Sequence, residues 1–588
     1  MAYRWRAVCH LTHYATMYPK FAPNVRGLMS ERILIGVAWP YANGPLHMGH
    51  IAGCYLAADI FARYHRLKGN QVLMVSGSDQ HGTPITLRAE QEGVSPQEIV
   101  SRYHQDFLQS WERLGISFNL FTNTGTENHR ETAQDIFKAL QDKKYIYTAT
   151  TPLPYCHTCR RFLPDRYLKG TCPNCGNLDT RGDQCDNCGK PMNPEDLIDI
   201  QCRISGDTPE IRDSEHFFFK LSAFQKPLLA WVNKQKHWRS NALNFTRRYL
   251  EDGLKDRAIT RDLDWGVPVP VTGYDKKRMY VWFEAVIGYL SASKEWASTQ
   301  GQPDAWMPFW QENTRSYYFM GKDNIVFHTI IWPAMLMGYG GLNLPYDVPA
   351  NEFVTLEGKQ LSTSRNWAVW ITDYLDNYDP DPLRYHLSAT MPETSDSDFS
   401  WGDFVRRNND ELVATYGNLV HRVLTFTYRN FDGRIPQPEE LDQSAQDFLS
   451  RSDQLFQDID HNLSLCHFRN ALSGAMSMAQ EANRYLDSKK PWKTLKENPK
   501  ATATTLWVVL SVINCLKTAL YPFLPFSSEK LHAMLGFHNA LSENGWGWEA
   551  SQNALPPGQT MNSPEALFSK LDDDVATAEV ERLEQSVS

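Results

Sequence analysis

Several features that define common classes of protein are missing from this sequence. No stretch approaches the roughly 18 consecutive apolar residues that a membrane-spanning helix needs, and there is no internal repeat or low-complexity tract. A GxxxxGKS/T motif is absent, which excludes a Walker-type loop as a phosphate site. An excess of basic over acidic residues is absent too. The net charge of −9 argues against a nucleic-acid partner, although a local basic face can exist on an acidic protein.

What is present describes a soluble chain of several domains. At 588 residues, with 42% hydrophobic and 22% charged side chains, it should form two to four domains, each with an ordinary core. There is no secretory signal, and six of the eleven cysteines lie between Cys156 and Cys188. This clustering favours metal ligation in a reducing, cytoplasmic compartment over disulfides.

The first 28 residues differ in composition from the rest. They contain no acidic side chain, and their basic residues are Arg4, Arg6, Lys20 and Arg26. Such a composition is typical of a mitochondrial transit segment. The alternative is a start codon assigned too far upstream, with the true chain opening at Met29. We favour this second interpretation and treat residues 1–28 as an N-terminal extension.

The chain then opens with a β-strand, a helix and a second strand. Arg32–Trp39 is short, apolar and β-rich, and a Pro/Asn/Gly turn follows it. Apolar residues recur at helical spacing from His47 to Leu67, and Gln71–Gly77 predicts the next strand. A βαβ unit of this length implies a parallel sheet, which binds ligands at the carboxyl ends of its strands.

This pattern is interrupted by the cysteines and is replaced by helices after Trp401. The sequence therefore predicts an α/β fold: a Rossmann-type doubly wound parallel sheet with a cysteine-rich insertion and an all-helical C-terminal domain. The predicted boundaries are 29–148 and 246–357 for the two halves of the α/β domain, 149–245 for the insertion, 358–402 for a linker, 403–560 for the helical domain, and 561–588 for an acidic tail that is a helix or a loose end.

His47-Met48-Gly49-His50 is the candidate phosphate site. It begins the first helix directly after the first strand, and a helix N-terminus attracts phosphate through its unpaired N–H groups and its dipole. The two imidazoles can donate hydrogen bonds to a phosphorus centre that gains charge, and Gly49 lets a nucleotide approach the backbone. The alternative interpretation is two surface histidines, which the strand–turn–helix context disfavours.

Three CxxC pairs predict a zinc module: Cys156/Cys159, Cys172/Cys175 and Cys185/Cys188. Two such pairs complete a closed tetrahedron of thiolates, so the zinc would be structural rather than catalytic. Cys156 and Cys159 either hold a second zinc, with Cys202 and His157 as candidate further ligands, or are free.

Residues 40–50 resemble the HIGH signature region of class I aminoacyl-tRNA synthetases in its methionyl form. Further blocks agree in order, and the resemblance runs from about Ile33 to Leu535. These blocks are Asp79-Gln80-His81-Gly82-Thr83-Pro84, Phe162-Leu163-Pro164-Asp165-Arg166, Asp213-Ser214-Glu215-His216-Phe217-Phe218, Tyr280-Val281-Trp282-Phe283-Glu284-Ala285, Gly321-Lys322-Asp323, and Phe327-His328 followed by Trp332-Pro333-Ala334-Met335-Leu336.

The resemblance implies a two-step reaction: methionine and ATP give methionyl-adenylate and pyrophosphate, and the methionyl group then passes to the 3′ end of tRNA(Met), for initiation and elongation. It implies that His47 and His50 stabilise the phosphates, that Gly49 contacts ATP, and that Mg²⁺ accompanies ATP. The usual structural zinc site of the family corresponds to Cys172, Cys175, Cys185 and Cys188. No further module follows the helical domain, so a monomer is expected.

The second family signature, the ATP-gripping KMSKS loop, is altered here. Gln360-Leu361-Ser362-Thr363-Ser364 occupies it, so neither signature lysine is in place and Thr363 stands where the ATP-contacting lysine usually lies. The archaeal-type branch resembles this variant. The missing positive charge is expected from one of three residues, Lys322, Lys359 or Arg365.

The resemblance also assigns the amino-acid pocket and the tRNA-reading surface. The pocket residues are Tyr41, Asp79, Trp282, Ala285, Tyr289 and His328, with Asp79 pairing the substrate ammonium and aromatic rings contacting the thioether. Trp39 replaces a smaller aliphatic residue common at that pocket, and some homocysteine editing is expected. Asn418 and Arg422 share a helix face and, with Trp492, would read the CAU anticodon. Without the resemblance, these aromatic and polar residues would be interpreted as packing and surface positions.

Two other functions are compatible with parts of the sequence. One is a different adenylate-forming enzyme, either a nucleotidyltransferase with an HxGH site or a synthetase for another amino acid. The other is a zinc-ribbon nucleic-acid binder whose α/β domain has lost catalysis, which only the altered KMSKS loop favours. Pyrophosphate exchange with each amino acid separates them.

Overall fold

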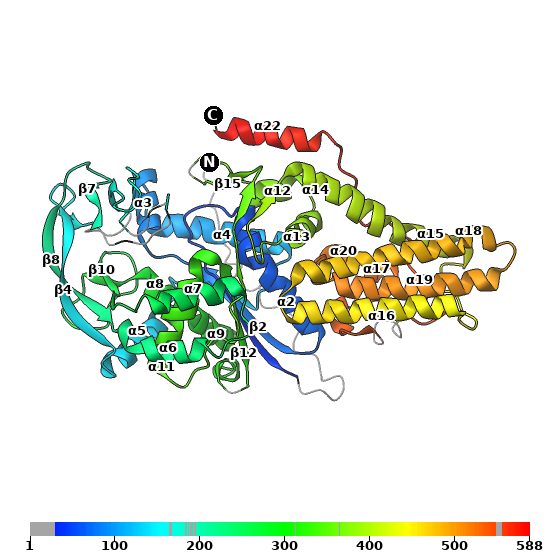
Figure 1. Ribbon diagram of the computed structural model, residues 1–588, viewed down its shortest axis with the longest axis horizontal. Coiled ribbons are helices and arrows are strands. Elements are labelled where there is room, and N and C mark those ends of the chain that lie inside the picture. The colour runs from blue at the N-terminus through cyan, green and yellow to red at the C-terminus, as the bar shows by residue number, and fades with distance from the viewer. Residues whose placement is uncertain are drawn as a thin grey trace, which may run out of the picture.

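The computed structural model describes residues 30–587 apart from 164–166, 183, 184, 186, 189–191, 193–195, 312, 364 and 549–554. The expectations for residues 1–28, for Pro164-Asp165-Arg166 and for Ser364 lie outside this described part. The molecule is elongated, with an α/β region at one end and a bundle of long helices at the other (Figure 1).

A five-stranded parallel sheet lies at the centre of the α/β region. Its order is β13-β12-β1-β2-β3, and all four strand pairs are parallel. The first strand therefore lies between its neighbours at the point where the strand order reverses, which is where such sheets bind ligands. The bounds are Arg32–Val37 for β1, Gln71–Ser78 for β2, Leu120–Asn123 for β3, Arg315–Gly321 for β12 and Ala350–Asn351 for β13.

Helices cover both faces of this sheet. Ile33, Ile35 and Val37 of β1 join one hydrophobic core and Leu34 joins the other, because side chains alternate between the faces of a strand. The first core includes α2 (Leu56–Leu67) and α4 (Pro96–Leu114), and the second includes α5 (Glu127–Asp142), α9 (Gly288–Thr299) and α11 (Trp332–Tyr339). The predicted Rossmann-type architecture is confirmed.

The cysteine-rich insertion is built on a long antiparallel pair. β4 (Ile146–Cys156) and β8 (Glu210–Phe219) run side by side from the pair Ile146↔Phe219 to the pair Tyr155↔Glu210. They carry β5 (Arg161–Phe162), β6 (Leu168–Thr171) and β7 (Ile198–Cys202) at their far end, away from the helical bundle (Figure 1).

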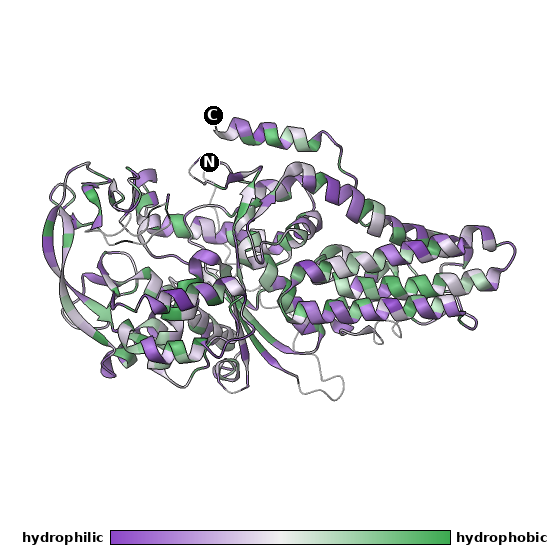
Figure 2. Cartoon of the chain, in the orientation of Figure 1, coloured by the Kyte–Doolittle hydropathy of each residue, from purple (hydrophilic) through white to green (hydrophobic). Residues whose placement is uncertain are grey.

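The C-terminal domain is helical, as predicted. It contains α14 (Trp401–Arg407), α15 (Asn418–Asn430), α16 (Gln443–Ser464), α17 (Phe468–Lys489), α19 (Pro499–Leu520) and α20 (Pro525–Met534). α19 is long and apolar enough to cross a membrane, but 89% of its most apolar window is buried within the protein. It contacts α16, α17 and α20 and is the core helix of the bundle, whose hydrophobic faces turn inward (Figure 2).

A buried arginine joins the two regions. Arg384 lies on α13 (Pro380–Ala389) and is fully buried. Its guanidinium donates to Asp59 Oδ2 at 2.7 Å, to the Leu114 carbonyl at 3.1 Å and to the Phe523 carbonyl at 2.8 Å. These acceptors belong to α2, to the end of α4 and to the α19–α20 connection, so one side chain links the sheet's helices to the bundle.

The acidic tail ends in a helix that folds back onto the linker. α22 (Val575–Val587) lies beside α14 (Figure 1). Tyr378 donates to Glu579 Oε1 at 2.8 Å, and Ser586 Oγ donates to the Asn366 carbonyl at 3.1 Å. The tail thus contacts the segment that follows the KMSKS-like residues.

Candidate functional site

The two signature histidines cap the first helix. His47 is the N-cap of α1 (Met48–His50), and its ring Nδ1 accepts from the Gly49 N–H at 3.1 Å. In return, the His47 N–H donates to Nδ1 of His50 at 3.1 Å, which gives a reciprocal capping box. The ring centroids are 3.9 Å apart. Both imidazoles are therefore positioned together at the carboxyl end of β1, as the sequence predicted.

These hydrogen bonds decide where each ring carries its proton. Because Nδ1 accepts a backbone N–H in both residues, a neutral ring must hold its proton on Nε2. Burial lowers the pKa of His50 to about 4, and burial together with His50 lowers the pKa of His47 well below its ordinary value. Both rings are therefore neutral near pH 7 and present Nε2–H groups as donors.

The KMSKS-like loop lies against this helix mouth. Met48 N donates to the Val369 carbonyl at 3.0 Å and Ile371 N to the Leu46 carbonyl at 2.9 Å. A Cβ at Gly49 would lie 2.6 Å from Cδ1 of Leu361 and 2.9 Å from the His47 ring, so a larger residue there would displace these side chains. The structure thus brings the two signatures together.

The three candidate cations differ in their surroundings. Lys322 Nζ is held by Glu352 at 2.8 Å and Asp396 at 2.7 Å, so two carboxylates already neutralise it. Lys359 Nζ lies over the Trp367 ring, 4.3 Å from its centroid. Arg365 is exposed and contacts the Ser362 hydroxyl through its backbone N and its Nε. Lys322 is therefore the least available of the three.

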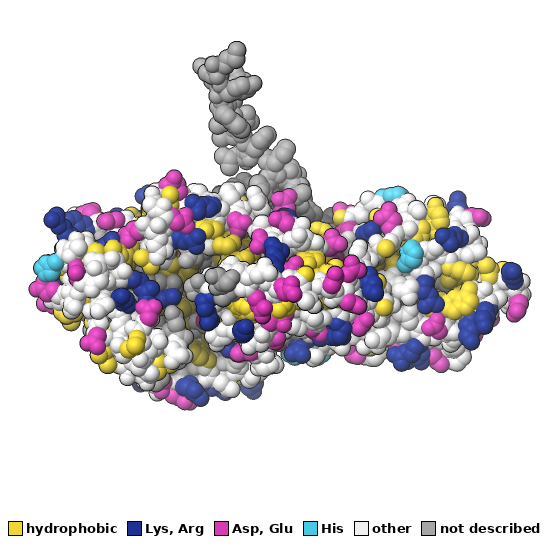
Figure 3. All heavy atoms as spheres, turned by 90° about the horizontal axis from the view of Figure 1, so that it is seen from above, with side chains coloured by type: hydrophobic (Ala, Val, Ile, Leu, Met, Phe, Trp, Pro, Cys, Tyr) yellow, Lys and Arg dark blue, Asp and Glu magenta, His cyan; other side chains and the backbone are white. Residues whose placement is uncertain are grey.

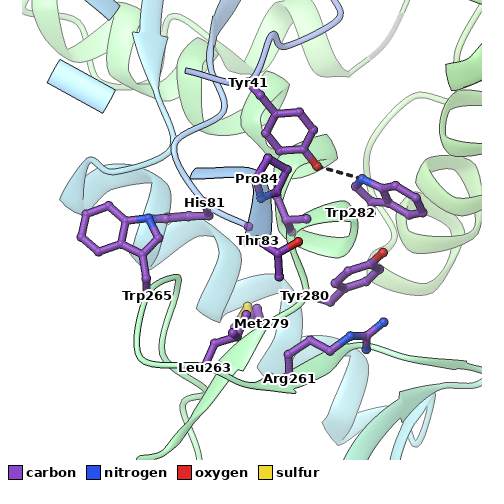
Figure 4. A pocket seen from close by; sticks show the side chains of 12 residues that line it. Tyr41, His81, Thr83, Pro84, Arg261, Leu263, Trp265, Met279, Tyr280 and Trp282 are labelled. Carbon is purple, nitrogen blue, oxygen red and sulfur yellow. Dashed lines mark hydrogen bonds between the residues drawn. The ribbon is translucent and has the colours of Figure 1, made fainter. Parts of the chain in front are cut away.

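Tyr41 and Trp282 form one wall of a cleft. The Trp282 indole N–H donates to the Tyr41 hydroxyl at 3.0 Å (Figure 4). The cleft is partly open to solvent. Its other labelled lining residues are His81, Thr83, Pro84, Arg261, Leu263, Trp265, Met279 and Tyr280 (Figure 4).

Asp79 lies next to this wall, paired in a parallel bridge with Tyr41. Its side chain is 3% exposed. Burial, and secondarily the charge of Glu284, raise the pKa of Asp79 well above its ordinary value. An ammonium group placed beside Asp79 would reverse this shift, because an opposite charge favours the carboxylate.

The remaining pocket residues pack around a second aromatic pair. His328 Nδ1 donates to the Asn324 carbonyl at 2.8 Å, so its Nε2 accepts from the Tyr289 hydroxyl at 2.7 Å. Ala285 lies between Trp282 and Tyr289 in sequence, on the turn that links α8 (Val281–Glu284) to α9. Burial lowers the pKa of His328 to about 4, so this pair is neutral.

Trp39 fits into the pocket because glycines surround it. Its ring meets the Tyr289 ring edge-on at a centroid distance of 6.4 Å. A Cβ at Gly77 or Gly288 would lie 2.4 Å or 2.6 Å from the Trp39 ring. The large residue is thus accommodated by two positions that have no side chain.

Two charged residues, one near Asp79 and one on the cleft, were missed at the level of sequence. Glu284 is fully buried and bridges His81 at 2.8 Å and His129 at 2.6 Å. Burial raises its pKa, but the two histidines outweigh this and lower it. Arg261 lies over the Tyr280 ring at 3.8 Å on the same cleft. Neither belongs to a local motif, and only the resemblance block containing Glu284 offered a signal.

Four of the predicted zinc ligands converge. The Sγ atoms of Cys172, Cys175, Cys185 and Cys188 lie within 4.8 Å of one another, a spacing that suits four thiolates around one zinc. A second group joins Cys156, Cys159 and Cys202 at the same spacing. His157 is not part of it, because its ring is exposed and hydrogen-bonds Glu210 at 2.6 Å.

The predicted anticodon residues lie together at the distal part of the bundle. Asn418 is exposed at the start of α15. The guanidinium of Arg422 lies over the ring of Trp492 at 5.0 Å, which is on α18 (Pro491–Thr494) and is 43% exposed. This end of the molecule carries an apolar patch beside Lys and Arg side chains (Figure 3).

Comparison with known families agrees with this geometry. The model for "tRNA synthetases class I (M)" matches residues 33–424, which contain the sheet, both histidines and the insertion. Fold and site are thus those of a class I aminoacyl-tRNA synthetase. A second model, the anticodon binding domain of methionyl tRNA ligase, matches residues 435–586.

Individual relatives agree. The chain is 58% identical to a methionine–tRNA ligase of Dehalococcoides mccartyi, over 94% of this chain and 100% of the relative. It is 52% identical to the methionine–tRNA ligase of Thermomicrobium roseum, over 94% of this chain and 99% of the relative. The structure of Mycobacterium tuberculosis methionyl-tRNA synthetase in complex with methionyl-adenylate superposes with a TM-score of 0.76 at 26% identity. The match covers 92% of this chain and 99% of that chain. The chain belongs to the methionyl-tRNA synthetase family, whose members are methionine–tRNA ligases.

Proposed function

We propose that this ligase forms methionyl-adenylate at the mouth of α1 and then transfers methionine to the 3′ end of initiator and elongator tRNA(Met). In the first step a methionine carboxylate oxygen bonds to the α-phosphorus of ATP, and the bond from that phosphorus to the bridging oxygen breaks, releasing pyrophosphate. In the second step a ribose hydroxyl attacks the acyl carbon and AMP leaves.

His47 and His50 would act on the first step. Their Nε2–H groups, fixed by the capping box, can donate to phosphate oxygens that gain charge as the new bond forms. A preorganised donor of this kind is typically worth about 10²–10³ in rate, roughly 3–4 kcal/mol. The helix N-terminus adds its own partial positive charge.

Methionine would bind with its ammonium at Asp79 and its side chain among the aromatic rings. The carboxylate is buried and carries a raised pKa, so a cation beside it is strongly favoured. Tyr41, Trp282 and Tyr289 offer ring contacts to a thioether, which are worth about 0.3–1.5 kcal/mol each. Ala285 and His328 would complete the pocket.

The KMSKS-like loop would supply the positive charge for the triphosphate. Arg365 is exposed on this loop, whereas Lys322 is already paired with two carboxylates. We propose Arg365 as the principal contact, with Lys359 as the second, and ATP entering as its Mg²⁺ complex. Thr363 and Ser364 can contribute hydrogen bonds but no charge.

Cys172, Cys175, Cys185 and Cys188 would hold a structural zinc. Four thiolates leave no open position, so the ion stabilises the fold of the insertion without entering the reaction. No disulfide joins the ten cysteines in the described part of the chain, which suits a reducing compartment. We propose a cytoplasmic location, and a monomer as the working state.

Asn418, Arg422 and Trp492 would read the anticodon. An exposed tryptophan can stack on an unpaired base, which is worth about 1–3 kcal/mol. The guanidinium beside Trp492 can contact the same base or its phosphate. Because the overall charge is −9, binding of tRNA then depends on a local basic surface.

The capping box at the carboxyl end of β1 is the observation that carries this proposal. ATP–pyrophosphate exchange should respond to methionine alone among the amino acids. Exchange with a different amino acid would identify that amino acid as the substrate in place of methionine. No exchange at all would favour the non-catalytic nucleic-acid binder. Charging of tRNA(Met) by the same preparation tests the second step.

A further inference from the structure

Two adjacent helices of the α/β region carry positive charge without negative charge. From Lys220 to Leu250 the chain has seven Lys and Arg residues and no Asp or Glu, whereas acidic residues outnumber basic ones by 68 to 59 in the whole chain. This stretch contains α6 (Gln225–Val232) and nearly all of α7 (Ser240–Glu251), which lie side by side (Figure 1). A chain of net negative charge thus has one region of opposite sign.

The basic side chains lie on the outside of these helices and of the segment that connects them. The buried positions are taken by Leu228, Val232, Ala242, Thr246 and Leu250. Four exposed residues make up what we call the basic strip: Lys226, Lys234, Lys236 and Arg248. Among the described residues, no carboxylate forms an ion pair with any of these four. Their charge is therefore available to a partner.

The basic strip borders the active-site end of the sheet. α7 starts beside the segment that follows β13, where Asn241 Nδ2 donates to Glu352 Oε1 at 2.8 Å. Its buried side contacts the short helix Phe327–Ile331, which carries His328 of the amino-acid pocket. There Thr246 Oγ1 donates to Thr329 Oγ1 at 2.8 Å. The inner side of α7 thus supports the pocket, and its outer side presents the strip.

We propose that the basic strip binds the phosphodiester backbone of the acceptor arm of tRNA, an inference that rests on the proposed function. The 3′ end must reach the pocket, so the duplex that carries it has to lie on the surface around the pocket. A protein of net charge −9 repels a polyanion at long range, and positive side chains near the site offset that repulsion. Contacts to phosphate fix orientation without reading sequence, so the strip adds affinity and leaves the choice of tRNA to the anticodon.

The salt dependence of tRNA(Met) binding to the full-length protein tests this proposal. Each phosphate contact contributes about −0.9 to the slope of log affinity against log salt concentration. The triple variant Lys234→Ala, Lys236→Ala, Arg248→Ala should therefore have a slope that is shallower by about 2.5–3. Between about 50 and 200 mM salt, its loss of affinity should be about 30–60-fold smaller than that of the wild type.

A matched control separates the strip from the overall charge. Lys138→Ala, Arg451→Ala, Lys570→Ala removes three exposed basic side chains elsewhere on the protein, so both triple variants have the same net charge. The control should keep the slope of the wild type. Equal slopes for the strip variant and the control would overturn the proposal and assign the strip to an anionic partner other than tRNA.

Hydroxyl-radical footprinting of the same complexes identifies the part of the tRNA involved. Acceptor-arm nucleotides that the wild type protects should become accessible in the strip variant, while the anticodon loop stays protected; loss of protection at the anticodon instead would contradict the proposal. If the triple variant fails to fold, Lys236→Gln and Arg248→Gln alone should each make the slope shallower by about 0.9. Methionine-dependent pyrophosphate exchange by the wild type tests the proposed function separately, so a failure of the strip and a failure of that function can be told apart.

Discussion

Substitutions of His50 separate the two things that this side chain does. Its Nδ1 accepts the His47 N–H at 3.1 Å, which stabilises the helix start, and its Nε2–H is free to donate to phosphate. Asparagine places an acceptor where Nδ1 lies but has no group at the Nε2 position. Glutamine reaches the Nε2 position with an N–H donor.

His50→Asn should therefore retain stability and lose catalysis. The lost donor predicts a fall of about 10²–10³ in the rate of methionine-dependent pyrophosphate exchange, roughly 3–4 kcal/mol. His50→Gln should recover most of that rate. His50→Ala loses both roles, so it should show the same loss of exchange together with a decrease of about 1 kcal/mol in the free energy of unfolding for the unpaired His47 N–H.

Exchange kinetics and urea denaturation of the three variants measure these effects independently. If His50→Asn exchanged pyrophosphate as fast as the wild type, the Nε2–H would have no catalytic role. If all three variants lost stability in proportion to activity, the histidine would act only as a helix cap, and the proposed phosphate contact would be wrong.

Three further predictions address the amino-acid pocket, the tRNA surface and pH. Asp79→Asn keeps the shape of the buried carboxylate but removes its charge, so methionine activation should lose about 2–5 kcal/mol in kcat/KM, and an unchanged KM for methionine would exclude Asp79 as the ammonium partner. Trp492→Ala should weaken tRNA(Met) charging by about 1–3 kcal/mol with pyrophosphate exchange unaffected, and a parallel loss of exchange would indicate a packing role instead. His328 has a pKa of about 4 in the folded chain against an ordinary 6.5, so the unfolded chain binds the extra proton between these values and stability should fall as pH decreases through that range. Urea denaturation across that range should show a shallower decrease for His328→Gln, and equal slopes would remove His328 as the cause.

The parts of the site that could be predicted from sequence are those made by neighbouring residues. A helix cap involves residues three apart, and a CxxC turn closes on itself, so His47 with His50 and the four-cysteine group were both visible as motifs. The resemblance placed Tyr41, Asp79 and Trp282 in one pocket, and the structure brings them side by side. The sheet was predictable because buried parallel strands read as short apolar runs.

Only the tertiary structure decided which charges are already paired. Lys322 was a candidate for ATP, but Glu352 and Asp396 hold it. Glu284 meets His81 and His129 across 203 and 155 residues, and no local pattern indicates such partners. Long-range pairs of this kind depend on how the elements pack.

By itself, the sequence determined the order of the elements, the two histidines at a helix mouth and the CxxC turns, because backbone hydrogen bonds within a few residues depend on nearby side chains. The structure decided that Cys202 lies with Cys156 and Cys159, that His157 hydrogen-bonds Glu210 instead, and that the C-terminal helix contacts the segment that follows the KMSKS-like residues. Those outcomes depend on contacts between segments far apart in the chain, and burial and packing select them only when the whole chain has folded.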